Sequence, residues 1–179
     1  MFKPPAYIIH NSNSSERVEL VKDLQRKTGG MIVEAIMLPD GLEGNKESHL
    51  AVARLAKSLH PDKHYLVFED DCVLTEEWNK AIEGMQIADV LYLGYSDKCE
   101  HTTFGTHALL MGPKGRDALL HRANIVCHQV LRKQAMDHIL SRICREEGLL
   151  VAMPPFVARE YFAYQKKGIK SLITGQIRD

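Results

Sequence analysis

Cysteine is sparse in this chain, and its spacing excludes two classes of small protein. The 179 residues contain four cysteines, and no two of them form a C-x-x-C pair. Disulfide-stabilised domains and structural zinc sites need paired or closely spaced cysteines. We therefore expect Cys72, Cys99, Cys127 and Cys144 to be reduced thiols that belong mostly to the core.

The sequence also lacks an excess of charge and a long apolar run. Lys plus Arg and Asp plus Glu both number 23, so no net charge attracts the chain to nucleic acid or an anionic membrane, although a local basic patch is compatible with this balance. No apolar run approaches the roughly 20 residues that span a bilayer, and the start, Met1–Pro5, has no signal-peptide core. These two features favour a cytoplasmic location. A length of 179 residues with a hydrophobic content of 45% predicts one globular domain over residues 1–179.

What the sequence does contain is an apolar run that ends in three consecutive acids. Tyr65–Phe68 has no polar gap, which is typical of a strand covered on both faces of a parallel sheet. Glu69, Asp70 and Asp71 follow directly, at the carboxyl edge where open α/β sheets bind ligands. Adjacent carboxylates repel one another unless a cation or an Arg neutralises them. Hard oxygen ligands favour Mg²⁺ or Mn²⁺, shared with a substrate phosphate, so we expect a divalent metal here.

An acidic turn after a strand can instead serve only as a turn or as a cap for the next helix. For an arbitrary Asp-Asp pair, this plain structural role is the commoner one. Here the next helix has its own start signal at Thr75-Glu76-Glu77, after Val73 and Leu74. The acids are not needed as its cap, and the ligand interpretation is favoured.

Apolar segments and segments of helical periodicity alternate along the chain. The alternation predicts an α/β fold with a mostly parallel, Rossmann-like central sheet flanked by helices. The expected strands are Ala6–His10, Met31–Leu38, Tyr65–Phe68, Asp89–Tyr95, Ala108–Met111 and Leu149–Met153. The expected helices are Glu16–Lys27, Lys46–Leu59, Glu76–Met85, a short one after Gly112-Pro113, and Val126–Glu147.

Local signals set the ends of these helices. Asn13 with Glu16 resembles a capping box, and Asn45 is expected to cap the second helix. Gly29 and Gly148 are the expected stops, because glycine readily adopts the left-handed conformation that closes a helix.

The loop after the first strand is polar and, in a parallel sheet, lies at the same edge as the acids. Its backbone N–H groups and the side chain of Arg17 are candidates to bind a nucleotide base or phosphate. Ser and Asn are also ordinary turn formers, so the loop residues Asn11–Ser15 have a plain structural interpretation as well.

Several further polar residues carry both a chemical and a structural interpretation. His49 lies on the helix expected beside the acidic strand, and a locally satisfied structural role is favoured for it. His107 opens a strand that can deliver it to the metal edge, and a buried His with a backbone partner fits equally well. Asp137 is either a general base or a solvated helix Asp, inside a long helix or at the start of a second one. Cys99-Glu100-His101 matches no zinc spacing and is interpreted as part of a polar loop, Ser96–Phe104, that can act as a lid.

Three stretches together resemble glycosyltransferases of the GT-A fold, most closely glycosyltransferase family 25, the lipopolysaccharide and collagen sugar transferase type. The strand that ends in Glu69-Asp70-Asp71 is similar to the family's metal-binding E-D-D, its version of the D-x-D motif. Ser48-His49-Leu50-Ala51 is similar to the S-H segment that precedes it. Asp89–Gly94, Gly105–Ala108 and Pro113-Lys114-Gly115 resemble the later D-x-x-x-L-G and G-T-H-A…P-x-G stretches, in the right order.

The resemblance implies transfer of a sugar from a nucleoside diphosphate donor, expected to be UDP-linked, to a hydroxyl of a glycan or lipopolysaccharide-like acceptor. It implies that Asp71 binds Mn²⁺ or Mg²⁺, and that Glu69 reaches the ribose or the metal through water, with Asp70 supporting the geometry. Such a metal stabilises charge on the departing diphosphate. His107 is a candidate for a further metal or phosphate contact. If the reaction inverts the anomeric centre, Asp137 is the candidate base.

The opening of the chain departs from the family pattern N-L-D-R-S-x-x-R, because the segment Ile9–Arg17 lacks the Asp. His10, Asn11 and Arg17 are the candidates for the nucleotide contact in that loop. Two other functions are compatible with strand-end acids. A nucleotidyltransferase is expected to have a Gly-rich, basic phosphate-binding loop after the first strand, and the segment His10–Glu16 has neither Gly nor Lys. A non-catalytic module would keep the donor site without turnover.

Overall fold

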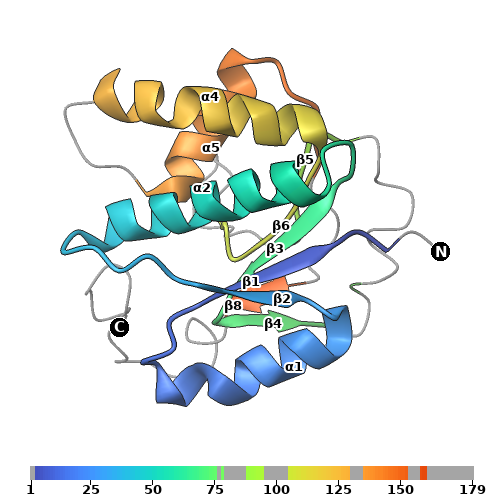
Figure 1. Cartoon of the computed structure of the whole chain (residues 1–179). Helices are drawn as coiled ribbons and strands as arrows, with labels where there is room; N and C mark the ends of the chain where they lie inside the picture. Colours follow the sequence, from blue (N-terminus) through green and yellow to red (C-terminus); the bar gives the residue numbers. More distant parts are fainter. Residues whose placement is uncertain are drawn as a thin grey trace.

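A six-stranded sheet forms the centre of the molecule, with helices on both sides (Figure 1). The computed structural model describes residues 3–75, 78, 88–94, 105–129, 135–152 and 158–160. The strand order is β2-β1-β3-β6-β5-β7. These strands are β1 (Ala6–His10), β2 (Met31–Glu34), β3 (Tyr65–Glu69), β5 (Val90–Tyr92), β6 (Ala108–Met111) and β7 (Val151–Ala152).

The strand directions confirm a mostly parallel sheet with one reversal among the described strands. β1 runs parallel to both β2 and β3, and β5 runs parallel to β7. β6 is antiparallel to its neighbours β3 and β5. The start of β6 therefore lies at the edge where β3 ends, and the backbone N–H of Glu69 donates to the carbonyl oxygen of His107 at 2.9 Å.

The helices cover the two faces unequally. Figure 1 shows α2 (Gly41–Leu59), α4 (Pro113–Gln129) and α5 (Met136–Glu146) together on one side of the sheet. On the other side lie α1 (Val18–Thr28), which follows the short helix η1 (Ser15–Arg17), and a two-stranded sheet of β4 (Cys72–Leu74) and β8 (Ala158–Glu160).

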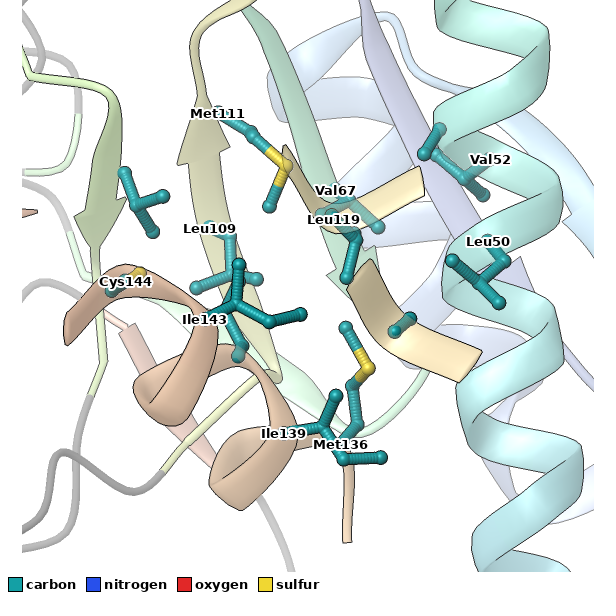
Figure 2. Packing of buried hydrophobic residues seen from close by; sticks show 14 of the residues in the cluster. Leu50, Val52, Val67, Leu109, Met111, Leu119, Met136, Ile139, Ile143 and Cys144 are labelled. Atoms are coloured by element: carbon teal, nitrogen blue, oxygen red, sulfur yellow. The ribbon is translucent and has the colours of Figure 1, made fainter. Parts of the chain in front are cut away.

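Alternate residues of the central strands enter two separate cores, which explains the gapless apolar run of β3. Tyr65 and Val67 pack in the core beneath α2, α4 and α5, whereas Leu66 and Phe68 pack in the core that α1 covers. Figure 2 shows how the first of these cores is filled, with strand residues meeting side chains of three helices. Its labelled members are Leu50, Val52, Val67, Leu109, Met111, Leu119, Met136, Ile139, Ile143 and Cys144. Full burial of a Val, Leu or Ile side chain stabilises a fold by about 1.5–3 kcal/mol, so β3 is anchored on both faces.

The boundary between β2 and α2 differs from the prediction. The strand ends at Glu34 instead of continuing to residue 38, and α2 begins at Gly41 rather than at Lys46. Asp40 is the cap, because its carboxylate accepts the backbone N–H groups of Leu42 and Glu43 at 3.0 and 3.5 Å. The predicted cap, Asn45, lies inside the helix.

The expected capping box at Asn13 is also wrong. The first cap residue is Ser14, which makes no side-chain cap hydrogen bond, and the Asn13 N–H donates to the side chain of Asn11 at 3.1 Å. Gly29 does close α1 in the left-handed conformation, with φ of 67°, as predicted.

The long helix predicted over Val126–Glu147 is two elements, and the short helix predicted before it is the 17-residue α4. Ala135 has an extended backbone, with ψ of 153°, so a new helix starts at Met136. Several predictions fall outside the described residues. They are the body of the helix Glu76–Met85, the possible lid Ser96–Phe104 with its Cys99-Glu100-His101, and most of the chain after Ala152.

Candidate functional site

The carboxyl edge of the sheet gathers polar residues from distant parts of the chain. β1 ends at His10, and β3 ends at Glu69 and passes directly into a turn at Asp70-Asp71. Because β6 is reversed, Thr106 and His107 reach the same edge just before that strand begins. All of these side chains are buried or nearly so. Buried polar groups are hydrogen-bonded, so their partners define the site.

Asp70 is held by groups from the loop after β1. Its Oδ2 lies 2.9 Å from His10 Nδ1 and accepts the backbone N–H of Asn11 at 3.1 Å. Its Oδ1 accepts from the guanidinium of Arg17. Only 5% of Asp70 is exposed, and a buried carboxylate is tolerated only when it is paired and hydrogen-bonded. Asp70 therefore ties the first loop to the end of β3.

Arg17 bridges two of the acids. Besides its hydrogen bond to Asp70, its Nη2 lies 3.5 Å from Oδ2 of Asp71. Backbone hydrogen bonds from Ser14 to Asn11 at 2.8 Å and from Arg17 to Ser14 at 3.1 Å turn the loop back toward the sheet. Burial opposes the charge of Arg17, but the nearby Asp71 and Asp70 outweigh it and raise the pKa of the guanidinium. The chain thus supplies its own counter-ion for this acid pair.

Glu69 is fixed by donors from α2 and from the start of β6. Its Oε1 accepts from the Thr106 hydroxyl at 2.8 Å and from the Asn45 amide at 3.3 Å, and it lies 3.0 Å from His49 Nε2. Burial alone would raise the pKa of Glu69, but the hydrogen bond and charge of His49 outweigh burial and lower it well below its ordinary range. Glu69 is therefore ionised and oriented at neutral pH.

Three of these donors were not predicted as site residues. Asn45 was expected to cap a helix, and His49 was expected to be satisfied locally, yet both meet Glu69. The signal available in the sequence was their spacing, because residues four apart lie on one face of a helix. Thr106 could have been found from its place beside His107 in a strand that returns to the acidic edge.

A cleft that opens to solvent lies beside these acids. Its carboxylate end is made by Glu69 and Asp70, and the segment 35–38 forms an apolar wall where the chain leaves β2. The other lining residues are Ile9, Asn11, Arg17, Gly41, Gly44, Asn45 and Ser48. A concave, largely apolar cleft with a few convergent polar groups is the usual form of a small-molecule site.

The apolar wall is fastened to α2 through one hydroxyl. The backbone N–H of Ile36 donates to Ser48 Oγ at 2.8 Å, and this hydroxyl donates to the carbonyl of Gly44 at 2.8 Å. The two segments are in direct contact, because a Cβ added at Gly44 would come within 2.5 Å of the Ile36 carbonyl oxygen. The position of the wall therefore depends on Ser48.

Ser48→Ala is expected to lower the free energy of unfolding by about 1–3 kcal/mol, because it leaves the Ile36 N–H without its acceptor. Urea unfolding measures the loss. Ser58→Ala is the matched control, since Ser58 lies on the same helix with its side chain exposed, and a surface substitution of this kind stays within about 0.5 kcal/mol. Equal stability of the two variants would contradict the anchoring role of Ser48.

Asp71 and His107 were the predicted metal ligands together with Glu69. Asp71 and His107 are 4% and 8% exposed, and His107 is near enough to Glu69 to help lower the pKa of that carboxyl. Within the part of the chain that the structure describes, no group of three or more such side chains is arranged to hold a metal ion. Mg²⁺ is commonly held by one or two carboxylates and by substrate phosphates rather than by a full protein cage. The hard oxygens of Asp71 and Glu69 fit that kind of ion.

Asp137 stands apart from the acid cluster, in the first turn of α5. Its Oδ1 accepts the backbone N–H of His138 at 2.8 Å. Burial raises the pKa of Asp137, and the negative charge of Glu69 raises it further. The two carboxylates are thus close enough to influence each other, and Asp137 is half-buried rather than a fully solvated helix residue.

Hydrogen bonds and ion pairs join most of the predicted site residues into two adjacent sets. The first set holds His10, Asn11, Arg17, Asp70 and Asp71, and the second holds Glu69 with the backbone of His107. Asp137 is linked to these residues by electrostatics, because the charge of Glu69 raises its pKa. Among the described helices, none is long and apolar enough to cross a membrane.

Comparison with known proteins places the fold. No family model and no curated protein matches the chain. The solved glycosyltransferase GlyE of Streptococcus pneumoniae is 11% identical, with a TM-score of 0.58 over 87% of this chain and 46% of that one, so this chain spans less than half of GlyE. A glycosyltransferase involved in glycosylation of the major capsid of PBCV-1 is 9% identical, with a TM-score of 0.55 over 84% and 82% of the two chains.

A third solved structure, Drosophila β1,4-galactosyltransferase 7 in complex with manganese, UDP-Gal and xylobiose, is 13% identical, with a TM-score of 0.55 over 99% of this chain and 81% of that one. At such identities the likeness concerns the fold alone, and it does not single out family 25. The chain has the GT-A fold of the nucleotide-sugar transferases.

Proposed function

We propose that this chain is a metal-dependent glycosyltransferase that moves a sugar from a UDP-linked donor to a hydroxyl of a glycan acceptor. The observation that carries the proposal is the position of the acids. Glu69 and Asp70 line a cleft at the carboxyl edge of parallel strands, which is where open α/β sheets bind ligands. The similar Drosophila enzyme was solved with manganese and UDP-Gal, which supports the same donor class here.

The type of transferase that we propose is that of family 25. The stretches that resemble this family are far apart in the sequence, yet they meet in space. His49 of the S-H segment and Thr106 of the G-T-H-A segment both contact Glu69 of the E-D-D segment, at 3.0 and 2.8 Å. Two chance similarities would have no reason to meet at the carboxylate of a third.

The cleft suits the two halves of a nucleotide. We assign the base and ribose to the wall formed by residues 35–38 and the start of α2, where Asn11 also lines the cleft and His10 holds Asp70 behind it. The diphosphate then lies toward the acids, where Asp71 and Glu69, together with the phosphate oxygens, would hold Mn²⁺ or Mg²⁺, and His107 stands beside Glu69. When bound, such an ion supplies Lewis-acid stabilisation of the negative charge on the departing diphosphate.

The acceptor hydroxyl must lose a proton as it attacks the sugar. We assign this role to Asp137, because its carboxylate is half-buried in the first turn of α5 and the charge of Glu69 helps to raise its pKa. Its raised pKa brings it closer to neutrality than an ordinary Asp, which makes it a stronger base. A single base that takes the proton of the attacking hydroxyl is what a direct displacement requires, and such a displacement inverts the anomeric carbon.

Calorimetric titration of UDP, GDP and CMP, each with and without Mn²⁺, tests the donor class. We expect UDP to bind only with Mn²⁺. Asp71→Asn should weaken this binding by about 100-fold or more, because losing even an indirect partner of a metal site costs about 10–100-fold. Asp117→Asn is the control, since Asp117 is an exposed residue of α4 that pairs with Lys57 at 3.1 Å.

The outcomes separate the alternatives. Failure of all three nucleotides to bind would contradict the transferase proposal. Binding of UDP and of UDP-sugars, with no release of UDP in the presence of acceptor glycans, would identify a non-catalytic donor-binding module. Release of pyrophosphate from a nucleoside triphosphate would identify a nucleotidyltransferase.

A further inference from the structure

Arg17 is a buried cation at a site that is expected to take a divalent cation. Only 4% of the residue is exposed, and its guanidinium contacts Asp70 and Asp71 together. An Arg side chain does not lose its proton in proteins, so this positive charge is permanent. Any metal ion that approaches Asp71 must therefore compete with a fixed charge 3.5 Å from the carboxylate oxygen.

The contacts of Arg17 with the two acids are unequal. The guanidinium makes a hydrogen bond to Asp70, whereas its distance of 3.5 Å to Asp71 is longer than a charge-assisted hydrogen bond of about 2.7–2.9 Å. Asp70 is also fixed by His10 and Asn11, which hold the guanidinium in place through it. The contact with Asp71 is thus the one that a ligand can replace.

Arg17 also lines the cleft. A diphosphate in the cleft would attract the guanidinium, because Arg binds phosphate oxygens well, and would add oxygen ligands for a metal. The same anion therefore removes the competitor of the metal and completes the metal's coordination.

We infer that Arg17 is a built-in counter-ion that keeps divalent metal off Asp71 until a nucleoside diphosphate enters the cleft, so that metal and donor bind together. Arg17 is then a positioning residue that sets the order of loading, rather than a simple nucleotide contact. The identity of the anion rests on the proposed function, whereas the competition between Arg17 and metal does not.

Titration of Mn²⁺ into the protein without nucleotide tests this competition. The electron paramagnetic resonance signal of the free ion measures how much Mn²⁺ is bound. Arg17→Gln is expected to bind Mn²⁺ at least about tenfold more tightly than the parent, since an adjacent Arg lowers the proton affinity of a carboxylate by about 10–1,000-fold. Arg26→Gln is the control, because Arg26 is an exposed α1 residue that pairs with Asp23, and its Mn²⁺ affinity should equal that of the parent.

A second pair of variants guards against misfolding of Arg17→Gln. Arg17→Gln combined with Asp70→Asn removes one charge of each sign, so the buried region stays balanced. Compared with Asp70→Asn alone, the double variant should again bind Mn²⁺ at least about tenfold more tightly. The two proteins differ only at Arg17, so the comparison isolates the guanidinium.

Coupling between metal and nucleotide supplies an independent readout. In the parent, UDP should increase the affinity for Mn²⁺, and this increase should shrink in Arg17→Gln, because the competitor that UDP displaces is already gone. Folded Arg17 variants that bind Mn²⁺ no more tightly than their references would overturn the inference. If the Arg17 variants show no gain in Mn²⁺ affinity but the parent still binds UDP with Mn²⁺, only the inference fails and the proposed function stands. A gain of Mn²⁺ affinity in a protein that binds no nucleotide supports the competition and refutes the proposed function.

Discussion

Asp137→Asn is expected to lower kcat by about 10²–10⁴-fold, the usual contribution of a general base, while leaving the fold at least as stable as the parent. Asparagine keeps the side-chain oxygen that accepts the N–H of His138 at 2.8 Å, so the first turn of α5 should be preserved. It removes a negative charge that burial and Glu69 both disfavour. Replacing a catalytic group that destabilises the folded state commonly raises stability and lowers activity.

The sign of the stability effect depends on pH. Burial and the charge of Glu69 raise the pKa of Asp137, so the folded state binds its proton more tightly than the unfolded state does. Stability from this group is then present below its unfolded pKa and is lost as pH rises through the folded pKa. The gain in Tm of Asp137→Asn should therefore appear at neutral pH and disappear in acid.

Release of UDP from UDP-sugars, measured with water or a glycan as acceptor, gives kcat. The acidic limb of the parent's pH profile should lie above the ordinary range of an Asp and should be absent in Asp137→Asn. Asp117→Asn changes an exposed carboxylate on α4 in the same way and should keep full activity. Retention of kcat by Asp137→Asn would rule Asp137 out as the base.

The acidic edge could be predicted because it depends on one short segment. A gapless apolar run indicates burial on both faces, and the structure shows why, since Val67 and Phe68 enter different cores. Burial on both faces implies a central strand, and the residues after a central parallel strand lie at the ligand-binding edge. Local composition was therefore enough to locate Glu69, Asp70 and Asp71.

The cation beside these acids could not be predicted in the same way. Charge repulsion requires some positive partner, and a divalent metal was expected in that role from the sequence, whereas the structure places Arg17 beside Asp70 and Asp71. Arg17 is 53 residues from Asp70, and it reaches the acid only because the loop after β1 turns back through Ser14 and Asn11. Such a contact depends on tertiary structure, and the periodicity and spacing of residues indicate only local structure.

The predicted start of α2 was wrong for a related reason. Asp40 and Asn45 are both good capping residues, and the sequence alone does not say which of them starts α2. The carboxylate of Glu69 settles the choice, because it takes the Asn45 amide as a donor and leaves capping to Asp40. A residue that both a helix end and a functional site can use is assigned correctly only when the partner is known.

Asp70→Ala is expected to lower the free energy of unfolding by about 3–5 kcal/mol, the cost of removing one partner of a buried ion pair. The substitution takes from the buried guanidinium of Arg17 the carboxylate that it hydrogen-bonds. It also removes the acceptor of the Asn11 N–H at 3.1 Å and the partner of His10. The first loop should therefore detach from β3, and the cleft should lose part of its polar lining.

Urea unfolding measures this loss, and Asp70→Asn separates charge from hydrogen bonding. Asparagine keeps an acceptor oxygen for the loop, so it should cost less than alanine at the same position. Asp23→Ala is the control, because Asp23 pairs with Lys27 at 2.9 Å on the partly exposed surface of α1, where an ion pair contributes about 0–1 kcal/mol. A loss in Asp70→Ala as small as that of the control would mean that Asp70 does not hold the loop, and that Asp71 alone determines where Arg17 lies.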